Sequence, residues 1–262
     1  MATILSVDNK KLEDIELPEI FAQKLNSGVL RKAFLAEESG TFQKKYTDPL
    51  AGKRKVGELT KRRRSYKTVY GRGYTRTPKK VLSRNGTQFY YVGAVAPHTV
   101  GGRQAHPPKA EKNLVKKLNK KERAIAIRMG IAASADRNLV SKFHRVAQMN
   151  DFPLIIEDKL NDIKKTKDLE KTLSALGLGE EIGRITERKI RAGRGKLRGR
   201  KYKKKLGIII VTSDNSNISA SARNLNITAL RPEQLSVRDV SNAGRPGRLI
   251  IWTKGAVASM KK

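Results

Sequence analysis

The sequence predicts an α/β fold, with a Rossmann-like, mostly parallel sheet, helices on both faces, and a long extended internal loop inserted into it. From Phe152 onward, short apolar segments alternate with helical ones, the pattern of parallel strands joined by crossover helices. "LGIIIVTSD" at Leu206–Asp214 contains the continuous apolar run expected of a strand buried on both faces. Between residues 45 and 110 both patterns are interrupted, which predicts an extended segment.

Two short strands, Ala2–Val7 and Asp14–Pro18, are predicted at the start of the chain, followed by a helix over Ser27–Ser39. After the loop, Leu118–Asp136 has the clearest helical pattern. We expect Asn119 to cap this helix and Glu122 to complete a capping box. Its apolar stripe comprises Ile125, Met129 and Ala132. A second helix is expected over Asn138–Met149.

The rest of the chain alternates strands and helices. Leu169, Leu173 and Leu176 form the apolar face of a helix that begins with Thr166 as its cap and is closed by Gly177. The predicted strands are Phe152–Asp158, Leu206–Asp214, Ile227–Leu230 and Arg248–Lys254, and the predicted helices are Thr166–Gly179, Asn217–Leu225, Arg231–Val240 and Gly255–Lys262.

Charge is the strongest global property of the sequence. The 262 residues include 57 Lys and Arg against 24 Asp and Glu, a formal net charge of +33. A compact fold with this charge repels itself unless a polyanion neutralises it, so nucleic acid is the first candidate partner and a membrane surface the second. No signal peptide, spanning segment or long basic amphipathic helix is predicted, which weakens the membrane alternative.

The absence of cysteine excludes disulfides, zinc ribbons, thiol nucleophiles and iron–sulfur sites, and favours an intracellular compartment. Three histidines are too few for a dense metal site, and no cofactor is predicted. We expect His144 to lie on a helix surface. His98 and His106 are expected to contact RNA or make structural hydrogen bonds.

Most of the excess charge lies in two segments. Residues 45–109 contain 16 Lys and Arg against Asp48 and Glu58, with tyrosines and glycines among them. Arginine planes and tyrosine rings stack on unpaired bases, and cations neutralise phosphates, so this composition suits a loop that threads through RNA. The candidate RNA-binding residues here are Lys53, Arg54, Lys55, Lys61, Arg62, Arg63, Arg64, Tyr66, Lys67, Tyr70, Arg72, Tyr74, Arg76, Lys79, Lys80, Arg84, Arg103, His106 and Lys109.

The second segment, residues 186–205, contains 11 Lys and Arg against the single acid Glu187. It directly precedes the most apolar strand, so we expect the fold to hold it as a phosphate-binding turn. Its candidate residues are Arg191, Arg194, Lys196, Arg198, Arg200, Lys201, Tyr202, Lys203, Lys204 and Lys205. The predicted organisation is therefore a body from residues 1–44 and 111–262, which includes this turn, and a loop over 45–110.

Sequence motifs typical of enzymes are weak or absent. Gly193, Gly195 and Gly199 resemble a dinucleotide fingerprint, but the strand follows them instead of preceding them. The sequence contains no P-loop motif. The acids at predicted strand ends, Glu157, Asp158 and Asp214, are expected to serve in solvation or helix capping. We predict no catalytic residue.

Several segments resemble the archaeal and eukaryotic branch of the large-subunit ribosomal protein four family. They are "GGRQAHPPKAEK", "LNKKERAIAIRMGIAASA", "IRAGRGKLRGRKYKKK", "IIIVTSD", "ARNL" and "GRPGRLIIWTKGAV", in this order. The archaeal form is the more similar, since the long C-terminal extension typical of eukaryotic members is absent. The resemblance spans nearly the whole chain and is weakest over residues 43–68.

The resemblance implies a structural constituent of the cytoplasmic ribosome, in which a globular domain lies on the large subunit. It also implies an internal loop that enters rRNA and reaches the wall of the peptide exit tunnel. The partners would be large-subunit rRNA, neighbouring ribosomal proteins and the nascent peptide. By position, the loop tip would comprise Gly71, Arg72, Gly73, Tyr74, Thr75 and Arg76.

On this basis His98–Lys109, "HTVGGRQAHPPK", is expected to take its conformation from RNA, without partners inside the protein. Two alternatives remain open from the residues alone. One is an RNA-binding assembly or remodelling factor that acts transiently, and the other is a nucleotide-dependent enzyme on the same fold.

Overall fold

The computed structural model describes residues 2–54, 60–146, 149, 151–213 and 217–260. The chain forms two compact units. The first, called the body, comprises Met1–Thr41 and Val115–Lys262, and the second, called the inserted unit, comprises Phe42–Leu114. Residues 45–110, predicted as the loop, all fall in the inserted unit.

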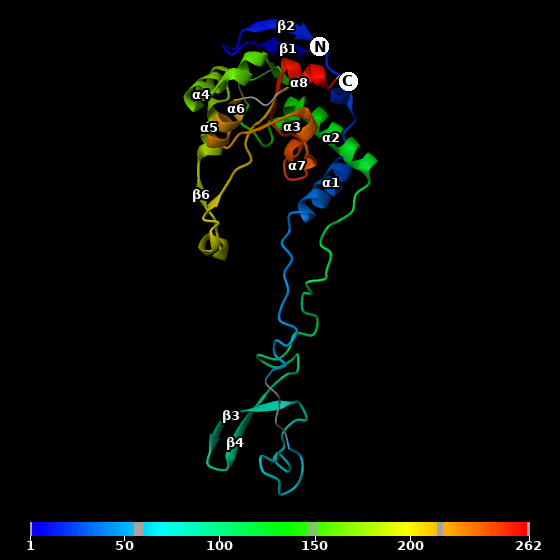
Figure 1. Ribbon diagram of the computed structural model, residues 1–262, viewed down its shortest axis with the longest axis vertical. Helices are drawn as coiled ribbons and strands as arrows, with labels where there is room; N and C mark the ends of the chain where they lie inside the picture. The colour runs from blue at the N-terminus through cyan, green and yellow to red at the C-terminus, as the bar shows by residue number, and fades with distance from the viewer. Residues whose placement is uncertain (1, 55–59, 147–148, 150, 214–216, 261–262) are drawn as a thin grey trace. The chain divides into compact units, whose positions relative to one another are not determined.

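The body is a mixed α/β fold with a mostly parallel six-stranded sheet (Figure 1). The strand order is β2-β1-β5-β10-β8-β9. Only β2 is antiparallel to its neighbour, and every other pair is parallel. The strands are β1 (Ala2–Leu5), β2 (Lys11–Ile15), β5 (Leu154–Ile156), β8 (Ile209–Val211), β9 (Thr228–Leu230) and β10 (Ile250–Thr253).

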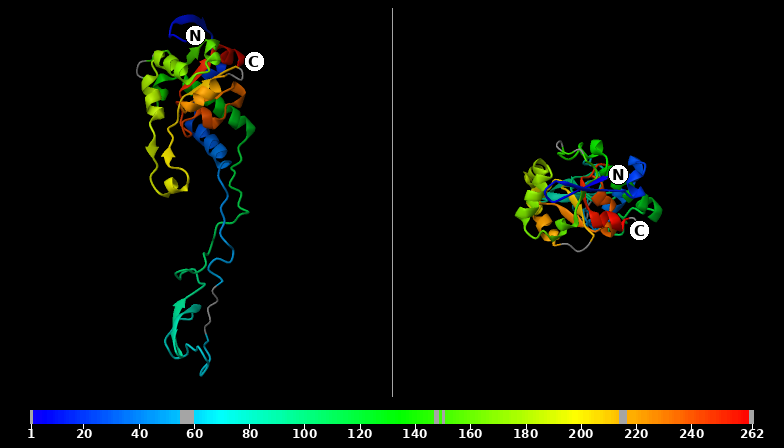
Figure 2. Two further views of the ribbon diagram at one scale, coloured as in Figure 1. Left: turned by 60° about the vertical axis from the view of Figure 1, so that its left-hand side comes forward. Right: turned by 90° about the horizontal axis from the view of Figure 1, so that it is seen from above.

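Helices cover both faces of this sheet (Figure 2). On one face, Leu154 and Ile156 pack in a cluster with α4 (Thr166–Ala175), α5 (Gly179–Thr186) and α6 (Ile218–Asn224). On the other face, Ile155 and Trp252 pack with α2 (Lys120–Ser134), α7 (Val237–Val240) and α8 (Lys254–Ser259). Because alternate strand residues point to opposite faces, the central strands β5, β8 and β10, which are covered on both faces, are buried along their whole length.

The remaining elements of the body are short, apart from α1 (Ser27–Ser39), which contacts α2 and α7. They are η1 (Glu19–Ala22), α3 (Arg137–Val140), η2 (Asp158–Asp162) and η4 (Pro232–Gln234), and the pair β6 and β7 with η3, described below. The N-cap Asn26 of α1 accepts hydrogen bonds from the backbone N–H groups of Gly28 and Val29. None of the described helices is long and apolar enough to cross a membrane.

Three expectations about α2, the longest described helix, differ from the structure. Asn119 is at the N-cap position, but its side chain makes no capping hydrogen bond. Glu122 instead binds Lys32 Nζ on α1, at 2.9 Å. Met129 and Ala132 are buried as expected, whereas Ile125 is 40% exposed.

Other boundaries also differ from the expected ones. The second strand is Lys11–Ile15, which starts three residues before the predicted Asp14–Pro18 and overlaps it only at Asp14 and Ile15. The expected helix over 138–149 is represented only by α3, Arg137–Val140, and its other described residues are not helical. Residues 231–240 form η4 and α7 instead of one helix, because Ser236 and Asp239 make a capping box that starts α7.

The inserted unit contains a β-hairpin formed by β3 (Lys79–Asn85) and β4 (Gln88–Gly93). Phe89 on β4 is buried, and its ring lies 5.3 Å from that of Tyr66 in an edge-to-face arrangement. The hydroxyl of Tyr91 donates to the carbonyl oxygen of Lys67 at 2.7 Å. The stretch "TQFYYVGAV", Thr87–Val95, is the one strand-like run of residues 45–109 and predicts β4, but no pattern predicts β3, so the unit contains more regular structure than expected.

The glycine-rich turn in His98–Lys109 has partners inside the inserted unit, contrary to the expectation that RNA alone fixes it. The backbone N–H of Arg103 donates to Val95 O at 3.0 Å, and that of Gly102 to Thr99 O at 3.1 Å. Gly52 packs so closely on this turn that a Cβ added to it would lie 2.4 Å from Gly102 O. Glycine is required at Gly52 both for this approach and for its positive φ of 77°.

Candidate RNA-binding surfaces

Residues 186–205 of the body form a small hairpin, called here the basic hairpin (Figure 1). Its two-residue strands β6 (Lys189–Ile190) and β7 (Tyr202–Lys203) pair antiparallel, with the turn η3 (Arg194–Arg198) between them. Gly193 and Gly199 flank this turn with positive φ values of 77° and 76°, a conformation that favours glycine. The basic turn predicted from charge is therefore a β-hairpin with defined secondary structure.

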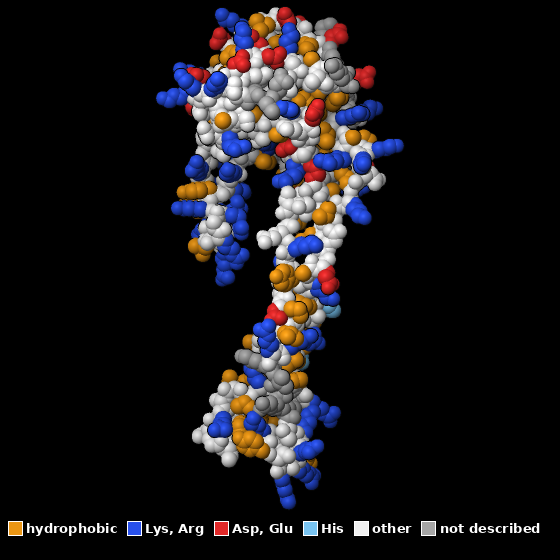
Figure 3. Space-filling model, in the orientation of Figure 1, with side chains coloured by type: hydrophobic (Ala, Val, Ile, Leu, Met, Phe, Trp, Pro, Cys, Tyr) orange, Lys and Arg blue, Asp and Glu red, His pale blue; other side chains and the backbone are white. Residues whose placement is uncertain are grey.

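Cationic side chains cover the basic hairpin along its length (Figure 3). Most of the predicted phosphate-binding residues in it are exposed, and Arg191 and Lys205 are half-buried. Tyr202 lies between two cations, with Arg188 Cζ 5.9 Å and Lys201 Nζ 5.5 Å from its ring centroid. Arg188 and Lys189 were missed as candidates, although both are exposed cations of the same segment.

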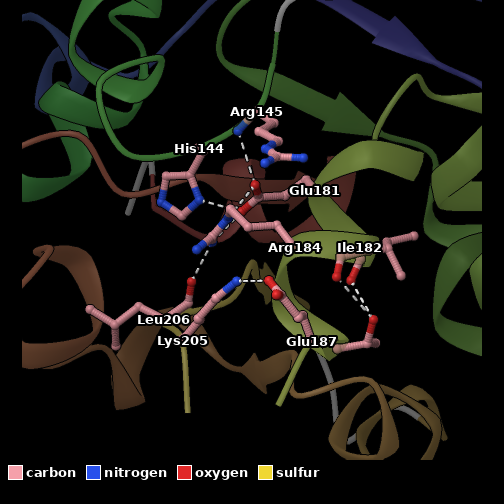
Figure 4. A network of polar contacts seen from close by, with 10 residues as sticks. His144, Arg145, Glu181, Ile182, Arg184, Glu187, Lys205 and Leu206 are labelled. Atoms are coloured by element: carbon pink, nitrogen blue, oxygen red, sulfur yellow. Dashed lines mark hydrogen bonds and ion pairs between the residues drawn. The ribbon is translucent and has the colours of Figure 1, made fainter. Parts of the chain in front are cut away.

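A buried ionic network ties the base of the basic hairpin to α5 and to the segment after α3 (Figure 4). The fully buried carboxylate of Glu181 on α5 accepts hydrogen bonds from His144 Nδ1 at 2.6 Å and from Arg145 N at 2.9 Å. Arg184 donates to both oxygens of the same carboxylate, at 2.7 and 2.8 Å. Arg184 Nη2 also donates to Leu206 O at 2.7 Å, immediately after the hairpin.

A second ion pair closes the hairpin at its two ends, where Lys205 Nζ binds Glu187 Oε2. This contact lowers the pKa of Glu187, first through the hydrogen bond and then through the charge of Lys205. Glu187 is the only acid in residues 186–205, so the remaining cations of the hairpin have no acidic partner within it. The Lys205–Glu187 pair thus joins the two ends of the hairpin, and the positive charge of the residues between them is not neutralised within the hairpin.

The protonation states of the network follow from its geometry. Burial alone would raise the pKa of Glu181, but the hydrogen bonds from Arg184, His144 and Arg145 outweigh it and lower the pKa to about 2. Burial, together with the charges of Arg248 and Arg184, lowers the pKa of His144, although the hydrogen bond and the charge of Glu181 act in the opposite direction. An ionised carboxylate only accepts hydrogen bonds, so neutral His144 carries its proton on Nδ1.

The expectation that His144 lies on a helix surface was therefore wrong. Its ring is buried, 3% exposed, and it follows α3 in an irregular segment. No local pattern could indicate this partnership, because Glu181 lies 37 residues further along the chain. The contact is structural and joins the segment after α3 to α5.

In the inserted unit, the tyrosines predicted to stack on bases are exposed, by 65% for Tyr66, 51% for Tyr70 and 41% for Tyr74. Arg63 lies over the ring of Tyr70, with Cζ 4.9 Å from the centroid, and donates to its hydroxyl at 2.7 Å. Arg63 and Tyr70 thus form a preorganised pair on the surface of the unit. The predicted tip, Gly71–Arg76, is exposed throughout.

The other candidates of the inserted unit differ in exposure. Lys79 is buried, and its Nζ donates to Thr75 O at 2.6 Å and Thr77 O at 3.2 Å, which closes the turn beside β3. Lys67, Lys80 and Arg103 are half-buried, and Lys55 lies outside the described residues. The exposed candidates are Lys53, Arg54, Lys61, Arg62, Arg63, Arg64, Arg72, Arg76, Arg84, His106 and Lys109.

The acids at the strand ends make structural contacts. Glu157 accepts from the backbone N–H of Val7 at 3.1 Å, and Asp158 accepts from that of Gly255 in the first turn of α8 at 2.9 Å. Asp214 lies outside the described residues. Among the residues that the structure describes, no group of three or more His, Cys, Asp or Glu could hold a metal ion.

These features define a class of basic α/β protein, with a fixed cationic hairpin on the body and a second, cation-rich unit inserted after α1. Residues 15–262 match the Ribosomal protein L4/L1 family, and the chain belongs to this family.

Individual relatives match over nearly their whole length. Large ribosomal subunit protein uL4 of Nanoarchaeum equitans is 38% identical over 263 residues, 99% of this chain and 97% of the relative. The proteins of the same name from Archaeoglobus fulgidus and Methanocaldococcus jannaschii are 35% and 34% identical, over 98% and 100% of this chain and 96% and 98% of their own. These names confirm the suspected family and give no support to a transient assembly factor.

Proposed function

We propose that this chain is a structural, non-catalytic constituent of the large ribosomal subunit that binds and organises large-subunit rRNA. The family and the names of its relatives support the assignment to the subunit. The observation that carries the mode of binding is the basic hairpin, whose exposed cations stand on a backbone that Glu181 and Arg184 anchor at its base. Cations fixed before binding lose less conformational entropy when they meet phosphates.

Within this function, the body is a Rossmann-like domain that docks on RNA helices, and residues 45–110 are a loop that threads into rRNA. The Arg63–Tyr70 pair offers a guanidinium and a ring for stacking on unpaired bases. The tip Gly71–Arg76 reaches the wall of the peptide exit tunnel and meets the nascent peptide. Neighbouring large-subunit proteins are its further partners. A photocrosslinker at Arg72 should then capture nascent peptide in translating ribosomes, whereas one at Lys171 should not.

Salt-dependent RNA binding tests the role of the basic hairpin. The triple variant Lys196→Gln, Arg198→Gln and Lys203→Gln removes three exposed cations of the hairpin. Affinity for large-subunit rRNA should fall, and the slope of log K against log salt should become less steep by about 0.7–0.9 for each phosphate that the variant no longer neutralises.

A matched control removes three exposed cations from the α4 region of the body, in the triple variant Lys164→Gln, Lys167→Gln and Lys171→Gln. Both triple variants lower the net charge by the same amount, so a difference in their affinity for rRNA would show that the hairpin surface binds RNA and the α4 surface does not. Equal affinities and equal slopes for the two triples would contradict the proposed role of the hairpin.

A further inference from the structure

The basic hairpin carries three exposed apolar side chains besides its cations. Ile190 on β6 is 59% exposed, Tyr202 on β7 is 43% exposed, and Leu197 in the turn η3 is 82% exposed. Hydrophobic side chains therefore interrupt the cations that cover the hairpin (Figure 3). A surface that binds only phosphates needs cations and polar groups, so these three side chains indicate a partner that also presents apolar surface.

Apolar and cationic side chains lie on opposite faces of the paired strands. Ile190 lies directly opposite Tyr202 across the two strands, and Lys189 lies directly opposite Lys203. Because successive residues of a strand point to opposite faces, Ile190 and Tyr202 share one face and the two lysines share the other. The guanidinium of Arg188, with its Cζ 5.9 Å from the ring centroid of Tyr202, adds a second planar group to the apolar face.

Leu197 lies where it contributes little to the fold. A backbone hydrogen bond from Arg200 N to Gly195 O, at 3.2 Å, closes the turn without its side chain. The contact between Ile190 and Tyr202 supports the pairing of the two strands, but a leucine that is 82% exposed in the turn buries very little apolar surface. Its burial would favour association with a partner that offers apolar surface of its own.

We propose that the basic hairpin binds RNA at a site of unpaired bases, where one base stacks on Tyr202 beside Ile190 and a second base packs against Leu197. The cations around them bind the phosphates. The inference rests on the RNA-binding function proposed above, and adds that this surface binds non-helical RNA in preference to a duplex.

The structure of RNA explains why apolar side chains favour unpaired bases. In an A-form duplex the flat face of each base is covered by its neighbours in the stack, and the accessible minor groove presents hydroxyl groups and base edges. The faces become accessible where bases are unpaired, and there tyrosine rings and arginine planes stack on them. Leucine is among the apolar side chains that nucleic-acid-binding proteins insert between bases. Duplex RNA alone would place Ile190, Leu197 and Tyr202 against polar groups.

The charge around these side chains favours RNA over an apolar surface of another protein. Each of the three has a Lys or Arg on both sides in the sequence, in "KIR" at residues 189–191, "KLR" at 196–198 and "KYK" at 201–203. A group that covers one of these side chains therefore meets cations beside it. A nucleotide joins a flat base to a charged phosphate and satisfies both requirements, whereas a protein partner would need an acid next to each apolar contact.

The test compares the affinity of the full-length protein for two RNAs, a fully paired duplex and the same duplex interrupted by an internal loop of unpaired bases. Wild type should bind the looped RNA more tightly. Tyr202→Ser should lower the affinity for the looped RNA about tenfold, as expected for the loss of one stacked base, and should leave the affinity for the duplex unchanged. Leu197→Ser, which lies outside the strand pairing, should act in the same direction. Because neither variant changes the charge, the dependence of binding on salt should remain that of wild type.

Three further variants serve as controls. Tyr202→Phe retains the ring and should recover the affinity that Tyr202→Ser loses. Leu12→Ser replaces a leucine of β2 that is 53% exposed, and should bind both RNAs as wild type does. The triple variant Lys196→Gln, Arg198→Gln and Lys203→Gln should instead weaken the binding of both RNAs, because it removes cations that bind phosphates.

A second measurement detects stacking directly. A fluorescent adenine analogue whose emission is quenched by stacking is placed at an unpaired position of the internal loop. Its emission should fall when wild-type protein is added, and should fall much less with Tyr202→Ser. An equal fall with both proteins would contradict stacking on Tyr202.

The outcomes separate this inference from the proposed function. If the triple variant binds both RNAs as wild type does, the proposed RNA-binding surface itself is wrong. If the triple variant is weakened but Tyr202→Ser and Leu197→Ser bind the looped RNA as wild type does, only the inference is wrong, and the apolar face is left to a protein partner. Equal affinity of wild type for the two RNAs would also overturn the inference.

Discussion

Replacement of Glu181 by glutamine should destabilise the body strongly, although the change is nearly isosteric. The carboxylate is fully buried and accepts four hydrogen bonds, two from Arg184 and one each from His144 and Arg145. Glutamine has one oxygen, and its amide would place N–H groups against other donors. Breaking a buried ion pair by removing one partner typically costs about 3–5 kcal/mol.

The pKa of Glu181 gives an independent magnitude. Lowering it from 4.5 to about 2 on folding corresponds to about 3 kcal/mol of stability, at about 1.36 kcal/mol per pKa unit. A carboxyl whose pKa is lowered by folding contributes this stability above its unfolded pKa of 4.5 and loses it as the pH falls toward 2. The difference between wild type and Glu181→Gln should therefore be largest near neutral pH and shrink in acid.

Urea unfolding of the free protein, followed by circular dichroism from neutral pH down to pH 3, measures this difference directly. For a body of this size, a loss of about 3 kcal/mol lowers the melting temperature by roughly 6–12 °C. Glu180→Gln is the matched control, since Glu180 is the preceding residue on α5 and is exposed. The reasoning is refuted if the two variants unfold at the same urea concentration, or if the effect of Glu181→Gln is independent of pH.

Two further predictions concern glycines. Gly130→Ala would place a Cβ 2.3 Å from Val240 Cγ2, between α2 and α7, so the free energy of unfolding measured in urea should fall by about 1–3 kcal/mol. In the control Gly183→Ala on α5, the added Cβ meets nothing within 4 Å and should stabilise the helix slightly. Gly102→Ala would place a Cβ 2.0 Å from Ala96 O and should open the turn at residues 95–103. Limited proteolysis should cut this variant there faster than Gln104→Ala, which alters an exposed side chain, and equal rates would show that the turn is already open in the free protein.

The parts of the fold that sequence predicted well are those with strong local patterns. The helix over Ser27–Ser39 has the predicted bounds, and the apolar run in Leu206–Asp214 contains the buried strand β8. The apolar pattern of the sequence did not predict elements that are short or exposed. α5 has only eight residues and begins at a glycine, and four of the seven residues of β3 are exposed, which hides its alternation.

For the candidate RNA-binding surfaces, charge density indicated the segments but not their geometry. That Lys79 is buried, whereas Lys80 beside it is half-buried, depends on the contacts of Lys79 with the carbonyl groups of Thr75 and Thr77. The partners of Lys79 are near in the sequence, but charge density does not indicate which lysine they enclose.

One contact in the body bears on how this architecture tolerates change. The backbone N–H of Lys116 donates to the buried hydroxyl of Ser39 at 2.8 Å, and thereby ties the end of α1 to the point where the chain returns to the body. Because the entropy of closing a loop grows only logarithmically, doubling the stretch between these two residues would cost about 0.6 kcal/mol. Insertions and deletions between these anchor points can therefore alter the reach of the inserted unit while the sheet and its helices stay as they are.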